Sequence, residues 1–269
     1  MDELYRIEYT YLMHNRLTDE LAVCGINAVT AIAEHHPDRI NRLFLREDRL
    51  KSFTQICKNL AERKRPYKIC ENEELERICK TIHHQGIVAM ILLPAIEPLS
   101  REDLDEWSGE GRSGLVLHSV GNDHNLGAII RSAVFFDFKY IIISEGDPEA
   151  KLSTSSYRVA EGGMEHVTVR SVRNTAAFLR DASKSIFIIG ADARARQRLG
   201  DLPRIIGEKQ KENYGNRPGI AVVLGNEETG LPGAVKDACT LLARVPGTGL
   251  MESLNVAQAA ALFMQRIFE

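Results

Sequence analysis

The stretch that decides the fold lies near the C-terminus and reads V-P-G-T-G-L-M-E-S-L-N-V-A, residues 245–257. It joins a short apolar run, residues 241–245, to an Ala-, Leu- and Phe-rich segment that ends at Phe268. A glycine-bearing turn between a buried strand and a helix lets backbone N–H groups approach a ligand closely and places polar side chains at its edge. The stretch therefore predicts a small-molecule pocket.

Two further segments repeat this design. The apolar run 221–224 opens into a loop that contains Gly225 and Gly230, and a helix is expected to follow. The apolar run 114–120 leads into the polar stretch 122–127, after which the pattern is helical. Three strand–loop–helix units thus place polar residues at the carboxyl ends of strands, where open α/β sheets bind ligands.

The segments N-L-G-A-I-I-R (125–131), L-G-N-E-E-T-G-L (224–231) and the C-terminal stretch (245–257) resemble the three motifs of the SpoU (TrmH-type) RNA 2′-O-ribose methyltransferases of the SPOUT superfamily. Their order and C-terminal placement also match, and the resemblance spans roughly residues 112–269. It implies a C-terminal trefoil knot, S-adenosyl-L-methionine as cofactor, tRNA or rRNA as substrate, and a homodimer.

The resemblance also implies two sets of site residues. The catalytic set is Arg131, Asn125, Glu227, Ser253 and Asn255. The cofactor-binding set, whose backbone would lie against the adenosine moiety, is Leu224, Gly225, Val245, Pro246, Gly249 and Leu254. One glycine would indicate only a tight turn, but four in two matching loops, at positions 225, 230, 247 and 249, favour a ligand site.

Arg131 is expected one or two turns into the helix after the first motif, where its planar guanidinium could clamp a phosphate of the target nucleotide. Proposals for the family make the matching arginine the base that takes the 2′-hydroxyl proton. Because a guanidinium with a pKa above ~12 has almost no free base at neutral pH, phosphate orientation and charge stabilisation are favoured. An ion pair with Asp137 or Glu227 is the structural alternative.

The other polar candidates each have two possible uses. Asn125 and Asn255 can donate and accept, so they could fix loop geometry or bind the ribose. Glu227 could hold Arg131 or a loop N–H group. Ser253 could either cap the last helix or bind the substrate.

Several positions depart from the pattern common in the family. They lie before the first motif, after its helix, in the second motif and in the loop 158–165. The residues concerned are Asn122, Asp123, Phe136, Asp137, Asn226, Glu228, Thr229 and Glu161. An extra carboxylate near an RNA path would repel phosphate, so these changes leave the identity of the substrate open.

The apolar runs of the C-terminal half predict an α/β domain with a mainly parallel sheet, because they are nearly continuous stretches of Ile, Val and Leu. Strands are expected at 114–120, 140–144, 166–170, 186–190, 219–224 and 241–245. Helices are expected at about 126–136, 174–183, 232–238 and 254–268. This domain is expected to cover residues 112–269.

The N-terminal half, residues 1–93, predicts a small layered α/β domain. Its expected elements are helices at 21–33, 53–64 and 73–81 and strands at 40–45, 67–69 and 87–93. Residues 25–29 and 83–89 resemble the substrate-binding domain of many SpoU enzymes, which is similar in fold to a ribosomal RNA-binding protein. Candidate phosphate contacts are Arg39, Arg42, Arg46, Arg49, Arg63, Lys64 and Arg65, and solvated surface charge is the alternative for each.

The composition is that of a globular protein, with 269 residues, 44% hydrophobic and 26% charged. The net charge of −3 comes mainly from residues 94–111, which contain 1 Lys/Arg and 6 Asp/Glu and are expected to form an acidic interdomain linker. Basic faces therefore remain possible on either side of it. With no apolar leader and no run near the ~20 residues needed to span a bilayer, a cytoplasmic location is expected.

Metal binding is not expected. The five cysteines form no C-x-x-C pair, and the histidine pairs 35–36 and 83–84 have no third ligand at a suitable spacing. A dinucleotide-dependent oxidoreductase is set aside, because Glu252 stands where the fingerprint needs its next glycine. The rival that remains is an RNA-binding or ribosome-associated protein that keeps the pocket without catalysis.

Overall fold

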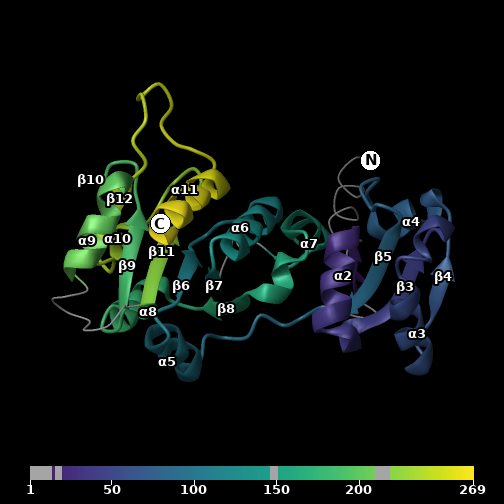
Figure 1. Cartoon of the computed structure of the whole chain (residues 1–269). Coiled ribbons are helices and arrows are strands. Elements are labelled where there is room, and N and C mark those ends of the chain that lie inside the picture. Colours follow the sequence, from purple (N-terminus) through teal and green to yellow (C-terminus); the bar gives the residue numbers. More distant parts are fainter. Residues whose placement is uncertain (1–13, 16–19, 146–150, 210–218) are drawn as a thin grey trace, which may run out of the picture. The chain divides into compact units, whose positions relative to one another are not determined.

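The structure is a computed structural model and describes residues 14–15, 20–145, 151–209 and 219–269. The chain forms two compact units (Figure 1). Unit 1 comprises Met1–Ala95 and Leu152–Glu165, and unit 2 comprises Ile96–Lys151 and His166–Glu269. No helix among the described residues is both long and apolar enough to cross a membrane.

Unit 1 is built on a five-stranded sheet in the order β1-β2-β5-β3-β4. All neighbouring strands are antiparallel except β3 and β4, which are parallel. The strands are β1 His14–Asn15, β2 Glu20–Cys24, β3 Ile40–Leu45, β4 Tyr67–Ile69 and β5 Ile87–Leu92. The helices from this part of the chain are α2 Ile26–His35, α3 Thr54–Glu62 and α4 Asn72–Cys79, with short 3-10 turns at Pro37–Arg39 and Glu47–Arg49.

The expected helix at 21–33 is wrong in its first part. Residues 20–24 form β2, every residue of which is buried, and pair with β5. Gly25 then turns the chain with φ +102°, a conformation that side chains rarely adopt, and α2 begins at Ile26. A strand buried on both faces is continuously apolar, so its pattern alone does not distinguish it from a helix.

Unit 1 also includes α7, Thr154–Ala160, from a part of the chain that the resemblance assigned to the second domain. Ser153 caps the helix in a reciprocal pair with Ser156, and the buried Thr154 hydroxyl donates to the carbonyl of Ala22 in β2 at 2.7 Å. At Gly162 a Cβ would lie 2.9 Å from that of Ala31 in α2, so the loop after α7 packs closely on that helix.

A buried ion pair adds to this contact within unit 1. Arg39 donates to Glu165 at 2.9 Å and to the Tyr157 hydroxyl at 2.7 Å, and only 1% of the Glu165 side chain is exposed. Burial raises the pKa of Tyr157 to about 12, so its hydroxyl stays protonated. Arg39, one of the expected RNA contacts, therefore has a structural partner.

Unit 2 is built on a seven-stranded sheet in the order β10-β12-β9-β11-β6-β7-β8, in which every neighbouring pair is parallel. The predicted parallel sheet is confirmed. Its strands are β6 Ser113–Leu117, β7 Phe138–Ser144, β8 Thr168–Val172, β9 Ile186–Ala191, β10 Gln197–Arg198, β11 Gly219–Leu224 and β12 Leu241–Arg244. The 3-10 turn Gly163–His166 precedes β8, which starts later than expected.

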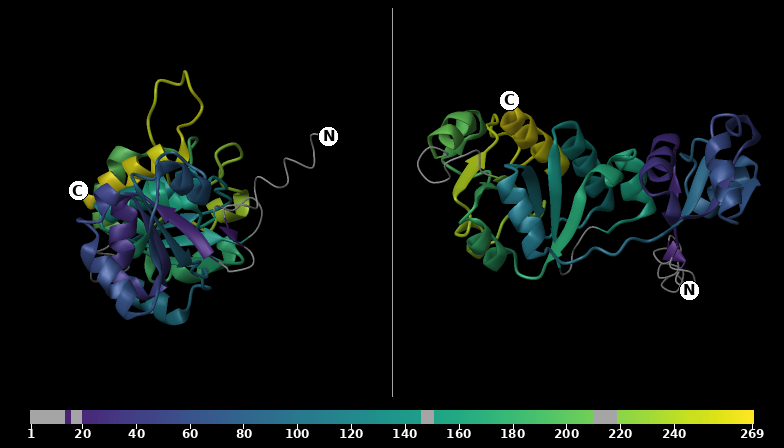
Figure 2. Two further views of the ribbon diagram at one scale, coloured as in Figure 1. Left: turned by 90° about the vertical axis from the view of Figure 1, so that its right-hand side faces the viewer. Right: turned by 60° about the horizontal axis from the view of Figure 1, so that its bottom comes forward.

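Helices flank this sheet (Figure 2). They are α5 Arg101–Gly109, α6 Asp123–Phe135, α8 Thr175–Ala182, α9 Leu202–Lys209, α10 Gly233–Lys236 and α11 Val256–Phe268. The main core packs α5, α8 and α10 against the strands, while α6 and α11 contact one another and neighbouring strands. Helices α5, α7 and α9 and strand β10 were not foreseen from the sequence.

Part of the expected linker, residues 94–111, forms helix α5 and packs in unit 2. Trp107 is fully buried and stacks on Tyr140 with ring centroids 4.9 Å apart. The indole also leaves room only for glycine at position 114, because a Cβ there would lie 2.5 Å from the ring. The acidic charge of this segment is partly structural, since the Asp103 carboxylate accepts the N–H of the N-cap residue Ser100 and binds Arg170 at 2.8 Å.

Candidate active site

The three motifs lie at the carboxyl ends of β6, β11 and β12. Strands β6 and β11 are neighbours, and their pairing continues past β6, where the His118 N–H donates to the carbonyl of Leu224 at 2.8 Å. From β6 the chain proceeds to β7 and β8 on one side, and it returns to β9 on the other side of β11. Such a reversal of strand order is where open α/β sheets bind their ligands.

A side-chain network joins all three motifs. Asn125, in the first turn of α6, donates from Nδ2 to Oε1 of Glu227 at 2.7 Å. Asn255 donates from Nδ2 to Oδ1 of Asn125 at 3.1 Å, while its own Oδ1 accepts the N–H of Ala257 and caps α11. Both asparagine amides are thereby fixed in orientation by donating at one end and accepting at the other.

The second-motif loop, residues 225–231, is tightly closed. The Asn226 amide donates to the carbonyl of Ser119 at 3.0 Å, and its Oδ1 accepts the N–H groups of Glu228 and Thr229. A Cβ on Gly225 would lie 2.5 Å from the carbonyl carbon of Gly230, so only glycine allows the loop ends to meet. Asn226, a departure from the family pattern, is therefore the residue that folds this loop.

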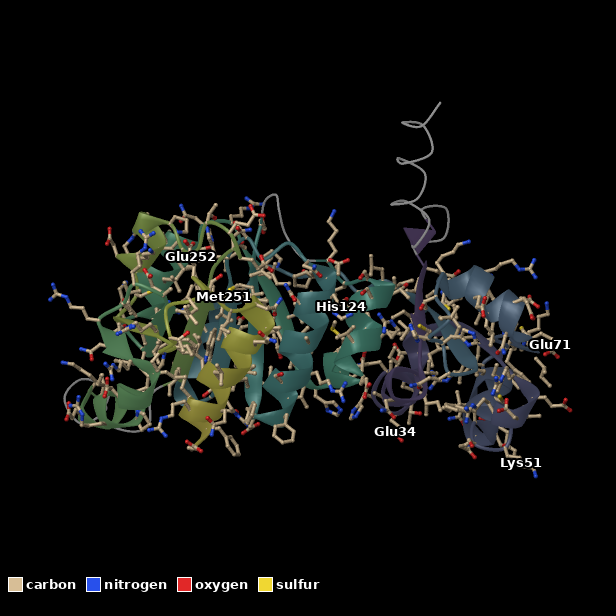
Figure 3. The ribbon with its side chains drawn as sticks, turned by 90° about the horizontal axis from the view of Figure 1, so that it is seen from above. Glu34, Lys51, Glu71, His124, Met251 and Glu252 are labelled. Carbon is tan, nitrogen blue, oxygen red and sulfur yellow. The ribbon has the colours of Figure 1, made fainter. Side chains whose placement is uncertain are left out.

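The third-motif loop, residues 246–254, is open by contrast. Each of its residues is exposed, Leu250 to 88% and Met251 to 81%. Among the described residues, its backbone N–H and C=O groups make no hydrogen bond to another backbone group. Figure 1 shows the loop projecting from the sheet, and Figure 3 labels Met251 and Glu252 in it and His124 in the first turn of α6.

The chemistry of this edge suits an adenosine moiety. Leu224 and Gly225 leave β11, and Val245 and Pro246 leave β12, toward the same side of the sheet. Leu250, Met251 and Leu254 offer apolar surface beside backbone groups that, among the described residues, make no hydrogen bond to another backbone group. A purine ring needs both kinds of contact, so these residues fit the expected cofactor.

Two predicted catalytic residues are not part of the network. Ser253 is exposed, and the cap of α11 that was considered for it is provided by Asn255. Arg131 is exposed on α6, six residues beyond Asn125, which is about 9 Å along the helix axis. Of the two carboxylates considered for an ion pair with it, Asp137 lies 3.8 Å from Arg112 and Glu227 accepts from Asn125.

His118 at the end of β6 was not identified from the sequence. Its Nδ1 lies 2.9 Å from the Thr175 hydroxyl at the start of α8, and burial lowers its pKa, so the ring is neutral at physiological pH. Its position directly after an apolar run, before the first motif, was the available signal. Ser119 beside it has φ +55° and is held by a hydrogen bond from its N–H to Ser144 Oγ at 2.9 Å.

An ion pair that was not predicted from the sequence lies at the base of the third-motif loop. Asp192, after β9, binds Lys236 Nζ at 2.6 Å, and its own N–H donates to the carbonyl of Ala243 in β12. Burial alone would raise the pKa of Asp192, but the contacts with Lys236 and the N–H of Arg194 outweigh it and lower the pKa.

Within the part of the chain that the structure describes, no group of His, Cys, Asp or Glu side chains could hold a metal ion. The histidine pairs have other contacts. His36 lies 3.5 Å from Glu165, and His84 accepts the N–H of Gly86. The five cysteines are free thiols.

Comparison with known families places the chain. Residues 113–265 match the SpoU rRNA Methylase family, and residues 22–94 match the family described as RNA 2′-O ribose methyltransferase substrate binding. The chain belongs to the SpoU rRNA methylase family. The resemblance noted in the sequence and the prediction of an RNA methyltransferase are thereby confirmed.

Individual proteins agree with this placement. The 23S rRNA (guanosine-2′-O-)-methyltransferase RlmB of Nitrosomonas europaea is 30% identical over 94% of this chain and 92% of its own length. The fold matches the SpoU methyltransferase AviRb from Streptomyces viridochromogenes in complex with AdoMet, with a TM-score of 0.69 and 19% identity over 100% of this chain and 97% of that one. It also matches the AdoMet-bound rRNA methyltransferase from Sinorhizobium meliloti, with a TM-score of 0.70 and 18% identity over 93% and 87% of the two chains.

These findings confirm an α/β fold of the SPOUT methyltransferase type and agree with the expected cofactor, S-adenosylmethionine. The trefoil knot, the likeness of the N-terminal domain to a ribosomal protein and the roles of the individual site residues stay predictions.

Proposed function

We propose that this member of the SpoU family transfers the methyl group of S-adenosylmethionine to the ribose 2′-hydroxyl of a guanosine in 23S ribosomal RNA. The RlmB relative supports this substrate, because it aligns with the chain over nearly its full length and carries that activity in its name. The observation that carries the proposal is the Asn255–Asn125–Glu227 network, which joins the three family motifs at one edge of the sheet.

The cofactor would be held by Leu224, Gly225, Val245, Pro246, Gly249 and Leu254. When bound, S-adenosylmethionine supplies an electrophilic methyl group on its sulfonium. The chain's contribution is to fix the loops around that group, since positioning alone can supply a large part of the rate enhancement in a transfer reaction. Asn125 and Asn255 do so by tying the start of α6 to the start of α11.

Arg131 would hold the phosphate next to the target ribose. Its guanidinium would orient the nucleotide and stabilise the charge that develops on the 2′-oxygen. Ser253, exposed in the third-motif loop, would contact the substrate rather than the helix terminus, because Asn255 already provides the cap.

The N-terminal domain, residues 1–93, would grip the RNA, as its match to a substrate-binding family supports. The structure narrows the candidate contacts. Arg39 binds Glu165, Arg42 binds Glu20 and Arg46 binds Asp48, while Arg65 donates to backbone carbonyls of its own unit. Arg63 and Lys64, exposed in the turn after α3, are the better candidates for phosphate contacts.

A homodimer is part of the proposal and rests on exposed aromatic surface where α6 and α11 end. Phe135 is 78% exposed and Phe268 is 59% exposed, and both pack on Phe136, with ring centroids 5.0 and 6.0 Å from it. Leu262 on α11 adds another exposed apolar side chain. Large apolar side chains grouped on one surface are typical of a protein interface. Sedimentation of Phe135→Glu should show a monomer where the wild type is a dimer.

The test is transfer of a labelled methyl group to purified 23S rRNA, with total tRNA as the competing substrate. Label at one ribose of the 23S rRNA, lost in Arg131→Ala, is the expected result. Label in tRNA alone would show that the substrate is a tRNA and not 23S rRNA. Cofactor binding without transfer to either RNA would favour the rival, an RNA-binding protein without catalysis.

A further inference from the structure

The segment between β9 and the turn before α9 is unusually rich in arginine. It reads A-D-A-R-A-R-Q-R, residues 191–198, and the side chains of Arg194, Arg196 and Arg198 are all exposed. Ala195 between them is buried, so the segment is packed onto unit 2. The arginines are therefore held on its surface.

The parallel pairing of β10 with β12 adds a fourth arginine. Arg198 is the register partner of the half-buried Arg244. Like charges on adjacent strands are unfavourable unless an opposite charge compensates them. We refer to Arg194, Arg196, Arg198 and Arg244 as the arginine strip.

Nothing in the described chain compensates these charges through an ion pair. The nearby Asp192 forms its ion pair with Lys236 and interacts with the charge of Arg194 only at longer range, and Asp201 accepts the backbone N–H of Arg198. Three other exposed arginines of unit 2 differ, because they pair with carboxylates: Arg101 with Asp105, Arg173 with Glu145 and Arg204 with Glu208. The strip therefore has positive charge available for an external anion.

The strip also lies beside the candidate active site. Arg244 is the last residue of β12, and the next residue, Val245, begins the third motif. The segment with the other three arginines leaves the carboxyl end of β9, the strand that separates β12 from β11 in the sheet. An anion bound along the strip would thus pass next to the loop expected to hold the cofactor.

We propose that the arginine strip binds the phosphate backbone of the substrate RNA on unit 2, separately from the N-terminal domain. This inference rests on the proposed function for the identity of the anion. Guanidinium groups bind phosphate through paired N–H donors and keep their charge at any physiological pH. The strip supplies affinity and register for the RNA and makes no contact with the transferred methyl group.

The test compares two triple variants with the wild-type, full-length protein. Arg194→Gln/Arg196→Gln/Arg198→Gln removes strip charges, and Arg101→Gln/Arg173→Gln/Arg204→Gln removes the same number of charges from paired arginines of unit 2. Affinity for a 23S rRNA transcript is measured over a range of salt concentrations. Loss of three phosphate contacts should make the slope of log K against log salt shallower by about 2 to 3 in the strip variant only.

The kinetic readout is equally specific. The KM for 23S rRNA should rise at least tenfold in the strip variant, while kcat and the affinity for S-adenosylmethionine stay within twofold. A variant with lysine at all three positions keeps the charge and should recover most of the salt slope, which shows that the replaced residues did not act by disturbing the fold.

Two results would overturn the inference. One is a strip variant whose RNA affinity and salt slope equal those of the control variant. The other is a dimer that dissociates only in the strip variant, which would assign the strip to contact between copies. A wild-type protein that binds 23S rRNA with the predicted slopes but methylates none would instead contradict the proposed function and leave the strip in place.

Discussion

The second-motif and third-motif loops leave the same edge of the sheet, yet they differ in how they are held. Residues 226–230 are closed by the Asn226 side chain and by the contact of Gly225 with Gly230. Residues 246–254 are exposed and unsupported by backbone hydrogen bonds within the described chain. We therefore expect the fold to build one side of the proposed cofactor site and the bound ligand to complete the other.

The strongest test of this difference exchanges glycine for alanine in each loop. At position 225 the new Cβ would meet the Gly230 backbone at 2.5 Å, while at 247 no atom lies within 4 Å. We expect Gly225→Ala to lower methyl transfer at least 100-fold and stability by about 1–3 kcal/mol, the usual range for overpacking. The free energy of unfolding of Gly247→Ala should stay within ~0.5 kcal/mol of the wild-type value, as is usual for surface substitutions.

Chemical denaturation and single-turnover methylation measure both effects. An equal loss of stability and of methyl transfer in the two variants would show that the two loops are equally constrained, which contradicts the proposed difference between them.

A smaller effect is expected where the open loop meets α11. Asn255→Asp keeps the oxygen that caps the helix but replaces the Nδ2 donor to Asn125 by a second oxygen. Asn255→Ala removes both functions and should cost about 1 kcal/mol of stability through the lost cap. Asn255→Asp should stay near wild-type stability, and both variants should lose methyl transfer by tenfold or more.

Thermal unfolding and steady-state kinetics separate the two roles. Full activity in Asn255→Asp would show that the bond to Asn125 does not matter and that only the cap does.

The smallest effect concerns pH and the base of the open loop. The folded-state pKa of Asp192 is lowered, so its pair with Lys236 contributes stability above the unfolded pKa near 4 and loses it as pH falls through the folded value. Asp192→Asn should therefore destabilise the protein at pH 7 and flatten the loss of stability below pH ~4. Urea unfolding of both proteins from pH 3 to 7 checks this, and parallel curves would contradict it.

The sequence predicted much of this molecule because the signals were local. The continuous apolar runs predicted the parallel sheet, and three short motifs predicted the edge of that sheet at which a ligand would bind. Helix α5 has one local signal, the capping-box spacing of Ser100 and Asp103, but its acidic residues 101–106 equally fit a solvated linker.

Other features depend on tertiary contacts and leave no local signal. The Asn226 side chain donates a hydrogen bond to Ser119, 107 positions away in the sequence, and the Asn255 side chain donates one to Asn125, 130 positions away. The motif match indicated that positions 125 and 255 matter, but it could not show that they contact each other. The packing of α7 in unit 1 likewise depends on a hydroxyl that reaches a carbonyl in another part of the chain.

Hydrogen exchange of the backbone amides, with and without S-adenosylmethionine, tests the central difference most directly. Amides of residues 247–254 should exchange rapidly in the free protein and slow at least tenfold on cofactor binding. Those of residues 226–230 should be protected already and change little. Equal protection of the two loops before the cofactor is added, or no slowing in residues 247–254 after it binds, would contradict the distinction between a prebuilt and a ligand-completed side of the site.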